Sequence, residues 1–516
     1  MRTVVIALAG LSAAAIALVV VARFLFSLPP QTDIPPSQAR PASPDSPLAN
    51  AVSSMAGAEP GKTGVFPLVS GRDAFLARML LAEQAADTID AQYYIWHDDL
   101  TGIMLLSALR RAAERGVRVR LLVDDNGVSN LDAELSALDA LPEMEVRLFN
   151  PFVLRQPKLL NYTFDFFRLN HRMHNKSFTV DGTATVIGGR NIGDEYFDTG
   201  PDSNFLDLDV LAVGDVVPDV STDFDLYWAS ASAYPVASIV APAHDGLQRL
   251  DSALEAHSAT DRYESYRSAL GASQLIENLR MGTLPLEWTD VRLVSDDPAK
   301  AQREARREDL MISRLFDLLG TPAKSLDLVS AYFVPGAQGT SQLTGLQAAG
   351  VDVRILTNSY EATDVALVHS GYTKYRKELL RSGAGLFELK AGALPATGRE
   401  ELGPFGSSGA SLHAKTFAVD GRHVFIGSFN FDPRSALLNT EMGLMIESPS
   451  IAGAIGTMFD TDLANICYRP LLADGELQWI EIQAGGEATH TVEPGTSFMS
   501  RAILTVAGWL PLEWLL

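Results

Sequence analysis

The chain has 516 residues, of which 47% are hydrophobic, and its formal net charge is −22 at pH 7. This length favours two domains of similar size, each with its own core. Because nucleic-acid binding needs a basic surface, the acidic balance argues against nucleic acid as a partner. An anionic lipid is not excluded, because a local basic patch acts at short range. Cys467 is the single cysteine, so an intrachain disulfide is excluded.

The first residues of the chain are strongly apolar. Residues 3–22 are uncharged and lie between Arg2 and Arg23. About 20 apolar residues are enough to span a bilayer, so residues 1–28 are predicted to form a transmembrane anchor. A cleaved signal peptide is the alternative, but its apolar region is shorter and ends in small residues.

The composition divides the rest of the chain into a linker and two lobes. Residues 29–64 are rich in Pro, Ser and Ala and predict a flexible linker. We expect a first lobe at residues 65–287 and a second at residues 288–516. The apolar stretch at residues 502–516 fits either a terminal segment packed on the core or an interfacial membrane contact.

The two halves repeat one pattern of secondary structure. A strand, a helix and a second strand are predicted in each half: residues 89–96, 101–115 and 117–123, then residues 326–334, 341–349 and 351–356. Gly116 and Gly350, which end the two helices, are separated by nearly as many residues as His174 and His413. The sequence therefore predicts a duplicated α/β domain with mixed sheets flanked by helices.

A short motif, H-x-K-x4-D, occurs once in each half and is followed each time by G-x-x-N. Its members are His174, Lys176, Asp181, Gly188 and Asn191, then His413, Lys415, Asp420, Gly427 and Asn430. Two copies with matching tails are a strong signal in a chain with nine histidines. Because alternate residues of a strand share a face, the histidine and lysine of each pair project together.

Packing of the halves about a pseudo-twofold axis would bring both motifs into one pocket. Two ammonium groups and two asparagine amides would bind a phosphate oxyanion and stabilise the charge that grows on it in the transition state. One imidazole can then attack phosphorus while the other protonates the leaving alcohol. No cofactor is expected, and no metal, because a lysine beside each histidine would repel a cation.

Carboxylates near the motifs have two predicted roles. Asp207 and Glu441 occupy matching places in the two halves and are expected to orient the imidazoles, with Asp209 as the alternative in the first half. Asp181 and Asp420 belong to the motifs. For them, a structural turn or ion pair is favoured over a direct part in catalysis.

The paired motifs resemble the phospholipase D superfamily, whose signature is this double pattern. Within it the chain is most similar to bacterial cardiolipin synthases with an N-terminal anchor. The closer resemblance is carried by residues 92–99, 173–191, 332–336 and 510–514. The resemblance implies two phospholipase D-like lobes forming a pseudo-dimer with one active site, a covalent phosphatidyl-histidine and no metal. It also implies that His174 is the nucleophile and His413 the acid.

One position departs from the family pattern. Gly189 stands where the motif usually has serine, as at Ser428 in the second half. We expect Ser428 to contact phosphate and Arg190 to replace the missing contact in the first half. Arg172, which follows a basic and aromatic stretch, and His97, which follows a predicted strand, are expected to bind substrate.

These observations lead to one expected function and three alternatives. Hydrolysis and transfer use the same catalytic residues, and the family resemblance implies transfer: an enzyme that moves a phosphatidyl group onto phosphatidylglycerol to make cardiolipin, with phosphatidylethanolamine as a further candidate substrate. The alternatives are a hydrolytic phospholipase D that releases phosphatidic acid, a metal-independent nuclease-like phosphodiesterase and a non-catalytic lipid-binding scaffold. The expected location is the bacterial inner membrane, with the lobes on the periplasmic side. The oligomeric state is not indicated.

Overall fold

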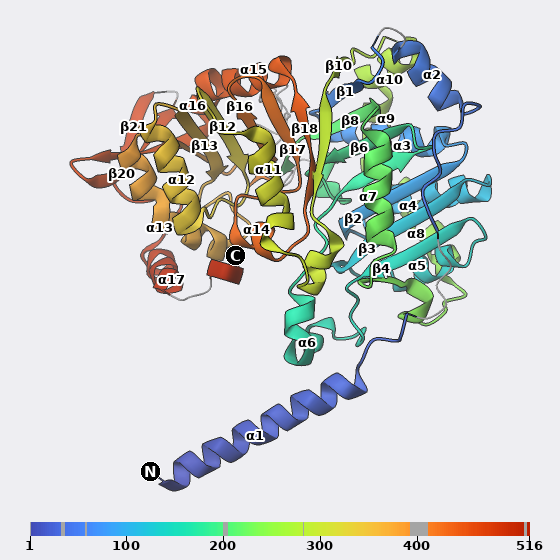
Figure 1. Ribbon diagram of the computed structural model, residues 1–516, viewed down its shortest axis with the longest axis horizontal. Helices are drawn as coiled ribbons and strands as arrows, with labels where there is room; N and C mark the ends of the chain where they lie inside the picture. The colour runs from blue at the N-terminus through green and yellow to red at the C-terminus, as the bar shows by residue number, and fades with distance from the viewer. Residues whose placement is uncertain are drawn as a thin grey trace.

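The computed structural model describes residues 2–31, 37–56, 59–199, 205–281, 283–392, 411–483, 485–509 and 513–515. Two lobes lie side by side, each built on a large mixed sheet with helices packed against it (Figure 1). The predicted α/β class and its duplication are confirmed.

The first lobe contains a sheet in the order β10-β1-β8-β6-β5-β2-β3-β4-β9. Its strands are β1 (Thr63–Leu68), β2 (Thr88–Trp96), β3 (Arg118–Val128), β4 (Met144–Phe149), β5 (Ser177–Val180), β6 (Ala184–Gly188), β8 (Asp209–Gly214), β9 (Ala233–Pro235) and β10 (Glu287–Thr289). Its helices are α3 (Gly71–Gln84), α4 (Leu100–Glu114), α5 (Asp132–Asp139), α6 (Tyr162–Leu169), α7 (Val217–Trp228), α8 (Gly246–Ser258), α9 (Asp261–Gly271) and α10 (Gln274–Met281).

The second lobe contains a sheet in the order β11-β18-β17-β16-β12-β13-β14-β19-β20-β21. Its strands are β11 (Val291–Ser295), β12 (Ser325–Ser330), β13 (Asp352–Asn358), β14 (Gly385–Leu389), β16 (Lys415–Val419), β17 (His423–Gly427), β18 (Met442–Glu447), β19 (Cys467–Ala473), β20 (Glu476–Gln483) and β21 (Gly486–His490). Its helices are α11 (Met311–Leu319), α12 (Gly336–Ala348), α13 (Ala366–Ser382), α14 (Pro433–Leu437), α15 (Pro449–Thr457), α16 (Leu463–Ile466) and α17 (Phe498–Trp509).

The internal repeat is visible in the strand order. The run β8-β6-β5-β2-β3-β4 of the first sheet matches the run β18-β17-β16-β12-β13-β14 of the second. In both runs the last three strands are parallel and the others antiparallel. A helix crosses over between the first two parallel strands, α4 in one lobe and α12 in the other. The same chain order therefore places both H-x-K motifs at equivalent strand ends.

A shared hydrophobic core holds the lobes together. It buries Ile187 and Val210 of the first sheet with Ile426 and Leu444 of the second. Burial of aliphatic side chains on this scale is the main driving force for keeping two lobes in one fixed arrangement. A short parallel pair, β7 (Phe205–Leu206) with β15 (Ser411–Leu412), also joins the lobes.

The chain crosses from one sheet to the other within a few residues. Strand β10 pairs with β1 in the first sheet, and β11 pairs with β18 in the second, so the crossing lies at Asp290. The expected start of the second lobe, residue 288, lies inside β10.

The predicted linker packs against the first lobe over much of its described length. The backbone N–H of Ala39 donates to Asp225, and the hydroxyl of Ser46 donates to Asp181 over 2.9 Å. A helix, α2 (Pro47–Ala56), follows and buries Val52 in the first-lobe core. The prediction of a free, flexible tether is therefore wrong for residues 37–56, because polar contacts and a short helix fix this segment.

The apolar N-terminal run forms a helix, α1 (Arg2–Leu25), that projects away from the lobes beside α6 (Figure 1). Phe26 stacks on Phe164 of α6 with ring centroids 5.6 Å apart. Within the described part of the chain, no helix combines the length and apolarity needed to cross a membrane. The predicted transmembrane anchor is not confirmed.

The C-terminal segment packs on the second lobe. Helix α17 contacts α13, and the hydroxyl of Tyr375 in α13 donates to Glu513 over 2.6 Å. Glu513 lies in the short helix η8 (Glu513–Leu515). Residues 510–512, part of the stretch that carried the family resemblance, lie outside the described residues, as does residue 516.

Candidate active site

The two H-x-K segments enter the interface between the lobes from opposite sides. The backbone N–H of His174 donates to the carbonyl of Thr440 over 2.9 Å, and that of His413 donates to the carbonyl of Leu206 over 2.8 Å. In each case the acceptor precedes a carboxylate of the other lobe. The backbone of one lobe therefore fixes the histidine of the other, and both pairs share one buried site.

Each imidazole is held by a carboxylate from the opposite lobe. Nδ1 of His174 lies 2.8 Å from Glu441, and Nδ1 of His413 lies 2.6 Å from Asp207. All four side chains are buried. A proton on Nδ1 donates to the carboxylate, which leaves the lone pair of Nε2 free. The structure thus pairs both predicted orienting carboxylates with imidazoles, and the pairing crosses between the lobes.

The two motif lysines are buried beside the imidazoles and change their protonation. Nζ of Lys176 donates to the carbonyl of His174 over 2.7 Å, and Nζ of Lys415 lies 2.9 Å from Nδ1 of His413. Burial, with the lysine charges, lowers the pKa of His174 to about 4 and that of His413 to about 3. Burial lowers the pKa of Lys176 to about 7 and that of Lys415 to about 8. Without an anion between them, both imidazoles are neutral at pH 7.

The motif asparagines differ between the lobes. Asn191 accepts the backbone N–H of Ile95 over 3.2 Å and donates to the hydroxyl of Tyr196 over 3.0 Å. The buried Oδ1 of Asn430 has no partner among the described residues. The Oδ1 atom of Asn430 is therefore free to accept a hydrogen bond from a ligand, whereas the amide of Asn191 is already engaged.

Aromatic rings cover both imidazoles. Tyr94 lies edge-on to His174 with ring centroids 5.1 Å apart. Tyr196 and Phe205 both lie about as close to His413, at 5.1 and 5.0 Å. These walls exclude water and strengthen electrostatic interactions inside the site. They were not predicted as site residues, although Tyr94 lies in a stretch that carried the family resemblance.

The motif aspartates lie in hairpin turns. Asp181 and Asp420 have φ angles of 50° and 54°, and each precedes a glycine with positive φ. The carboxylate of Asp181 accepts backbone N–H groups of residues 86–88, and that of Asp420 accepts those of residues 323–325. They stand at the far end of β5 and β16 from the lysines. Both carboxylates therefore bind backbone N–H groups away from the lysines, which is the arrangement that a structural role requires.

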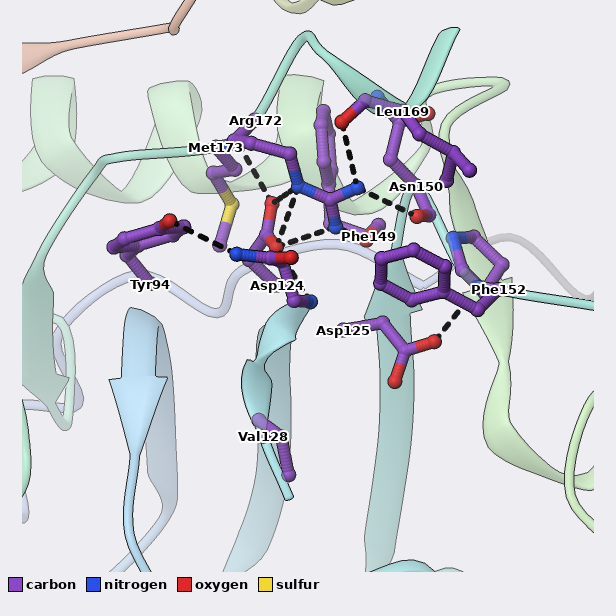
Figure 2. Close-up of polar contacts among 12 residues, drawn as sticks. Tyr94, Asp124, Asp125, Val128, Phe149, Asn150, Phe152, Leu169, Arg172 and Met173 are labelled. Carbon is purple, nitrogen blue, oxygen red and sulfur yellow. Dashed lines mark hydrogen bonds and ion pairs between the residues drawn. The ribbon is translucent and has the colours of Figure 1, made fainter. Parts of the chain in front are cut away.

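Arg172, expected to bind substrate, is instead part of a buried clamp (Figure 2). Its guanidinium donates to Asp124 and to the carbonyls of Asn150 and Leu169. Asp124 also accepts the backbone N–H of Met173 over 2.9 Å, directly before His174. The substrate-binding prediction is wrong for Arg172, because its donors are used to hold the segment that carries the first histidine.

Arg190 and Gly189 show why the first half lacks the serine. Arg190 is buried and donates to the carbonyls of Leu68, Val69 and Asp207, so it does not replace a phosphate contact. A Cβ on Gly189 would lie 2.1 Å from Oδ1 of Asp207. Asp207 therefore occupies the space that a serine would need.

Ser428 supports a carboxylate. Its hydroxyl donates to Oε2 of Glu441 over 2.5 Å and accepts the backbone N–H of Met442 over 3.0 Å. The expected phosphate contact is thus replaced by a contact that orients Glu441. Asp209, the alternative orienting carboxylate, forms a buried ion pair with Arg78 over 2.8 Å and does not hold an imidazole.

His97 lies half-buried at the end of β2, close to carboxylates. Its Nδ1 is 3.3 Å from Glu195 and 3.8 Å from Asp99, and these three residues are grouped closely enough to hold a cation. Both oxygens of Asp99 already accept backbone N–H groups, from Gly102 and Asp194. His97 therefore belongs to a polar cluster that caps α4, and its substrate-binding role remains a prediction.

Fold and site together define a two-repeat phospholipase D-like protein with one shared active site. The family model described as "Cardiolipin synthase, PLD-like domain" matches residues 80–228 and again residues 315–463. These ranges contain both H-x-K motifs, and they cover more than half of the chain. The chain belongs to this family.

Particular relatives extend the similarity over nearly the whole chain. Cardiolipin synthase C of Escherichia coli K12 is 48% identical over 471 residues, which is 91% of this chain and 99% of that protein. Cardiolipin synthase of Listeria welshimeri is 26% identical over 80% of this chain and 72% of its own. The crystal structure of phosphatidylserine synthase from Haemophilus influenzae shares the fold, with a TM-score of 0.56 and 14% identity over 91% of this chain and all of that one.

Proposed function

We propose that the protein is a phospholipase D-type phosphatidyltransferase that transfers a phosphatidyl group onto the free alcohol of phosphatidylglycerol and so makes cardiolipin. The observation that carries this proposal is the cross-lobe arrangement of two imidazoles, each with a buried lysine beside it and with no hydrogen bond at Nε2 to any described residue. Its support from outside the site is the close similarity to cardiolipin synthase C.

In the first step, Nε2 of His174 attacks the phosphorus of the donor lipid. The bond between phosphorus and the oxygen of the headgroup glycerol breaks, and His413 gives that oxygen a proton. A bound phosphodiester anion opposes the charges of Lys176 and Lys415, so it raises the pKa of His413 and lets this imidazole carry the proton. Glu441 stabilises the positive charge that develops on His174.

In the second step, His413 takes the proton of an incoming alcohol. The alcohol oxygen attacks the phosphatidyl group on His174, the P–N bond breaks, and the free imidazole returns. The lysines and the amide of Asn430 hold the equatorial oxygens throughout. Hydrolysis to phosphatidic acid would follow the same course with water as acceptor, and the aromatic walls over both imidazoles favour the lipid alcohol because they exclude water.

We propose further that the enzyme works at a membrane surface. Helices α1, α6 and α17 lie toward the lower side of the molecule in Figure 1. All three expose large apolar side chains: Ile16, Leu18, Phe166, Phe167, Ile503, Val506 and Trp509. Clustered exposed apolar groups of this kind mark interaction surfaces. A spanning anchor with periplasmic lobes stays a prediction, which carbonate extraction and protease accessibility in spheroplasts would test.

Product analysis tests the proposed reaction. The purified enzyme is incubated with labelled phosphatidylglycerol in mixed micelles, with and without phosphatidylethanolamine. Labelled cardiolipin with release of glycerol is the expected result. If phosphatidic acid is the sole labelled product, the protein is a hydrolase. If no lipid product forms under either condition, the transferase proposal is wrong.

A further inference from the structure

A cavity of about 300 Å³ opens in the second lobe between α11, α12 and α14. Its walls are mainly apolar and include Leu310, Val334, Phe429, Phe431 and Leu437. Leu437 is half-exposed and places an apolar side chain at the rim. A volume at the lower end of the range for ligand sites, lined in this way, fits a flexible apolar group better than a polar headgroup.

A second cavity lies beside the first, within the second lobe. This smaller cavity of about 60 Å³ lies beneath α11 and α12 and shares Ile312, Gln342, Phe429 and Phe431 with the first. Apart from Gln342, its walls are formed by aliphatic and aromatic residues with one glycine and one proline. The two cavities therefore adjoin each other, with these four residues forming walls of both.

The wall of the outer cavity includes the two sequence neighbours of the motif asparagine. Phe429 and Phe431 flank the motif residue Asn430, and side chains alternate along an extended segment, so Asn430 faces away from the cavity. The backbone N–H of Phe431 donates to the hydroxyl of Ser330, and Ser330 pairs with Lys415 in the sheet. The cavity wall is therefore built on the same backbone that positions the second half-site.

Asp432 links the cavity electrostatically to the site. It lines the cavity, and its carboxylate caps α14 by accepting the backbone N–H of Ser435 over 2.7 Å. Burial lowers the pKa of Lys415, and the nearby carboxylates, including Asp432, partly oppose this effect. Asp432 therefore belongs both to the cavity wall and to the set of carboxylates whose charge acts on Lys415.

Small residues keep the outer cavity open. Gly336 and Gly339, in the first turn of α12, face it, and Gly336 has a φ of +63°. A Cβ on Gly339 would approach the ring of Phe431 to 3.2 Å. Ala337 and Ala436 also line the cavity. Larger side chains at these positions would narrow or fill the space.

We propose that this two-part cavity is an acyl-chain subsite, which seats one fatty acyl chain of the phospholipid whose phosphate lies between the two H-x-K pairs. The inference rests on the proposed function, because it takes a phosphatidyl group to be the ligand of that site. Because burial of each methylene is favourable, the subsite selects for long chains and positions the phosphorus against His174.

The test compares cavity-filling variants on substrates that differ in chain length. Ala337→Phe and Ala436→Phe are assayed with dioleoyl and with dihexanoyl phosphatidylglycerol in mixed micelles. Ala348→Phe, at an exposed position on the last turn of α12 and outside the cavity lining, is the matched control. We expect both cavity variants to lower kcat/KM for the dioleoyl lipid by roughly tenfold and for the dihexanoyl lipid by less than about twofold, with no change in the control.

Equal losses on both lipids, or unchanged selectivity in both cavity variants, would overturn the subsite. A second measurement does not depend on turnover: phosphatidylglycerol with a diazirine at the end of an acyl chain is photo-cross-linked to the wild-type protein. Labelling of a peptide that contains Ala337 or Phe431, reduced in Ala436→Phe, supports the subsite even where no cardiolipin forms and the proposed function fails. Labelling elsewhere only would contradict it.

Discussion

The two half-sites share their H-x-K pairs but differ in how each histidine segment is held. Asp124, paired with the buried Arg172, accepts the backbone N–H that precedes His174. At the equivalent place in the second lobe, the amide oxygen of Asn358 accepts the N–H of Leu412, which precedes His413. The same backbone contact is thus made once by an ion pair and once by a neutral amide.

The orienting carboxylates differ in a related way. Glu441 is the longer side chain, and the hydroxyl of Ser428 fixes its end. Asp207 is shorter and lies against Gly189, where a serine would clash. Because each carboxylate serves the histidine of the opposite lobe, these differences make the environments of His174 and His413 unequal. The two half-sites therefore make the same kinds of contact with different residues.

The largest expected effect comes from removing either imidazole. We expect His174→Ala and His413→Ala each to lower transfer from phosphatidylglycerol by at least about a thousandfold, because groups that act in one displacement fail together. The measurement is cardiolipin formation by mass spectrometry, with folding checked by thermal denaturation. Retention of more than about a hundredth of the wild-type rate in either variant would contradict the paired mechanism.

The clamp of the first half-site is expected to give the next largest effect. Asp124→Asn leaves Arg172 buried without a counter-charge, which costs about 3–5 kcal/mol in the free energy of unfolding. The double variant Asp124→Asn with Arg172→Ser copies Asn358 and Ser411 of the second lobe and should recover part of the loss. Urea denaturation measures both. A single variant as stable as the wild type would show that the ion pair is dispensable.

The serine of the second half-site is expected to act on catalysis more than on stability. Ser428→Gly copies Gly189 and removes a hydrogen bond to Glu441, so kcat should fall roughly tenfold while KM changes little. The reverse change, Gly189→Ser, serves as the comparison because it forces a Cβ to 2.1 Å from Asp207. It should misplace the partner of His413 and cost more activity. A smaller loss in Gly189→Ser than in Ser428→Gly would contradict the asymmetry.

The change of kcat/KM with pH should be the smallest effect. It should follow the loss of charge on the two motif lysines. The pKa of Lys176 is lowered to about 7 and that of Lys415 to about 8. As pH rises through this range the lysines lose their charge, so kcat/KM for phosphatidylglycerol should fall severalfold between pH 7 and about pH 9. The imidazoles, with pKa values of about 4 and about 3, stay neutral down to about pH 5. A flat profile up to pH 9 would contradict the assignment of the lysines to phosphate binding.

The sequence predicted the features that depend on local pattern. The repeat, the strands that carry both motifs and the carboxylates Asp207 and Glu441 all follow from spacing and periodicity, which fix local structure. The pairing of each histidine with a carboxylate of the opposite lobe does not follow from the sequence, because it depends on how the two lobes pack. The sequence also does not show that the donors of Arg172 and Arg190 are used within the protein, since a buried arginine and an exposed one look alike in sequence.

The ends of the chain show a second limit. Composition marked residues 29–64 as a flexible linker, yet Ser46 and Ala39 bind carboxylates of the first lobe. Polar, proline-rich segments can pack when distant residues offer acceptors, and those acceptors are visible only in the fold. The acyl-chain subsite could not be predicted for the same reason, because α11, α12 and α14 meet only in the folded protein.

One measurement tests the central claim, that His174 carries the phosphatidyl group while His413 moves the proton. Phosphatidyl-p-nitrophenol, whose leaving group needs no proton, is mixed with His413→Ala and with His174→Ala, followed by a denaturing quench at mildly alkaline pH, which preserves the P–N bond, and peptide mass spectrometry. The account predicts a stoichiometric burst of p-nitrophenol from His413→Ala, a phosphatidyl group on His174, and no burst from His174→Ala. A burst from His174→Ala with the label on His413 would contradict it.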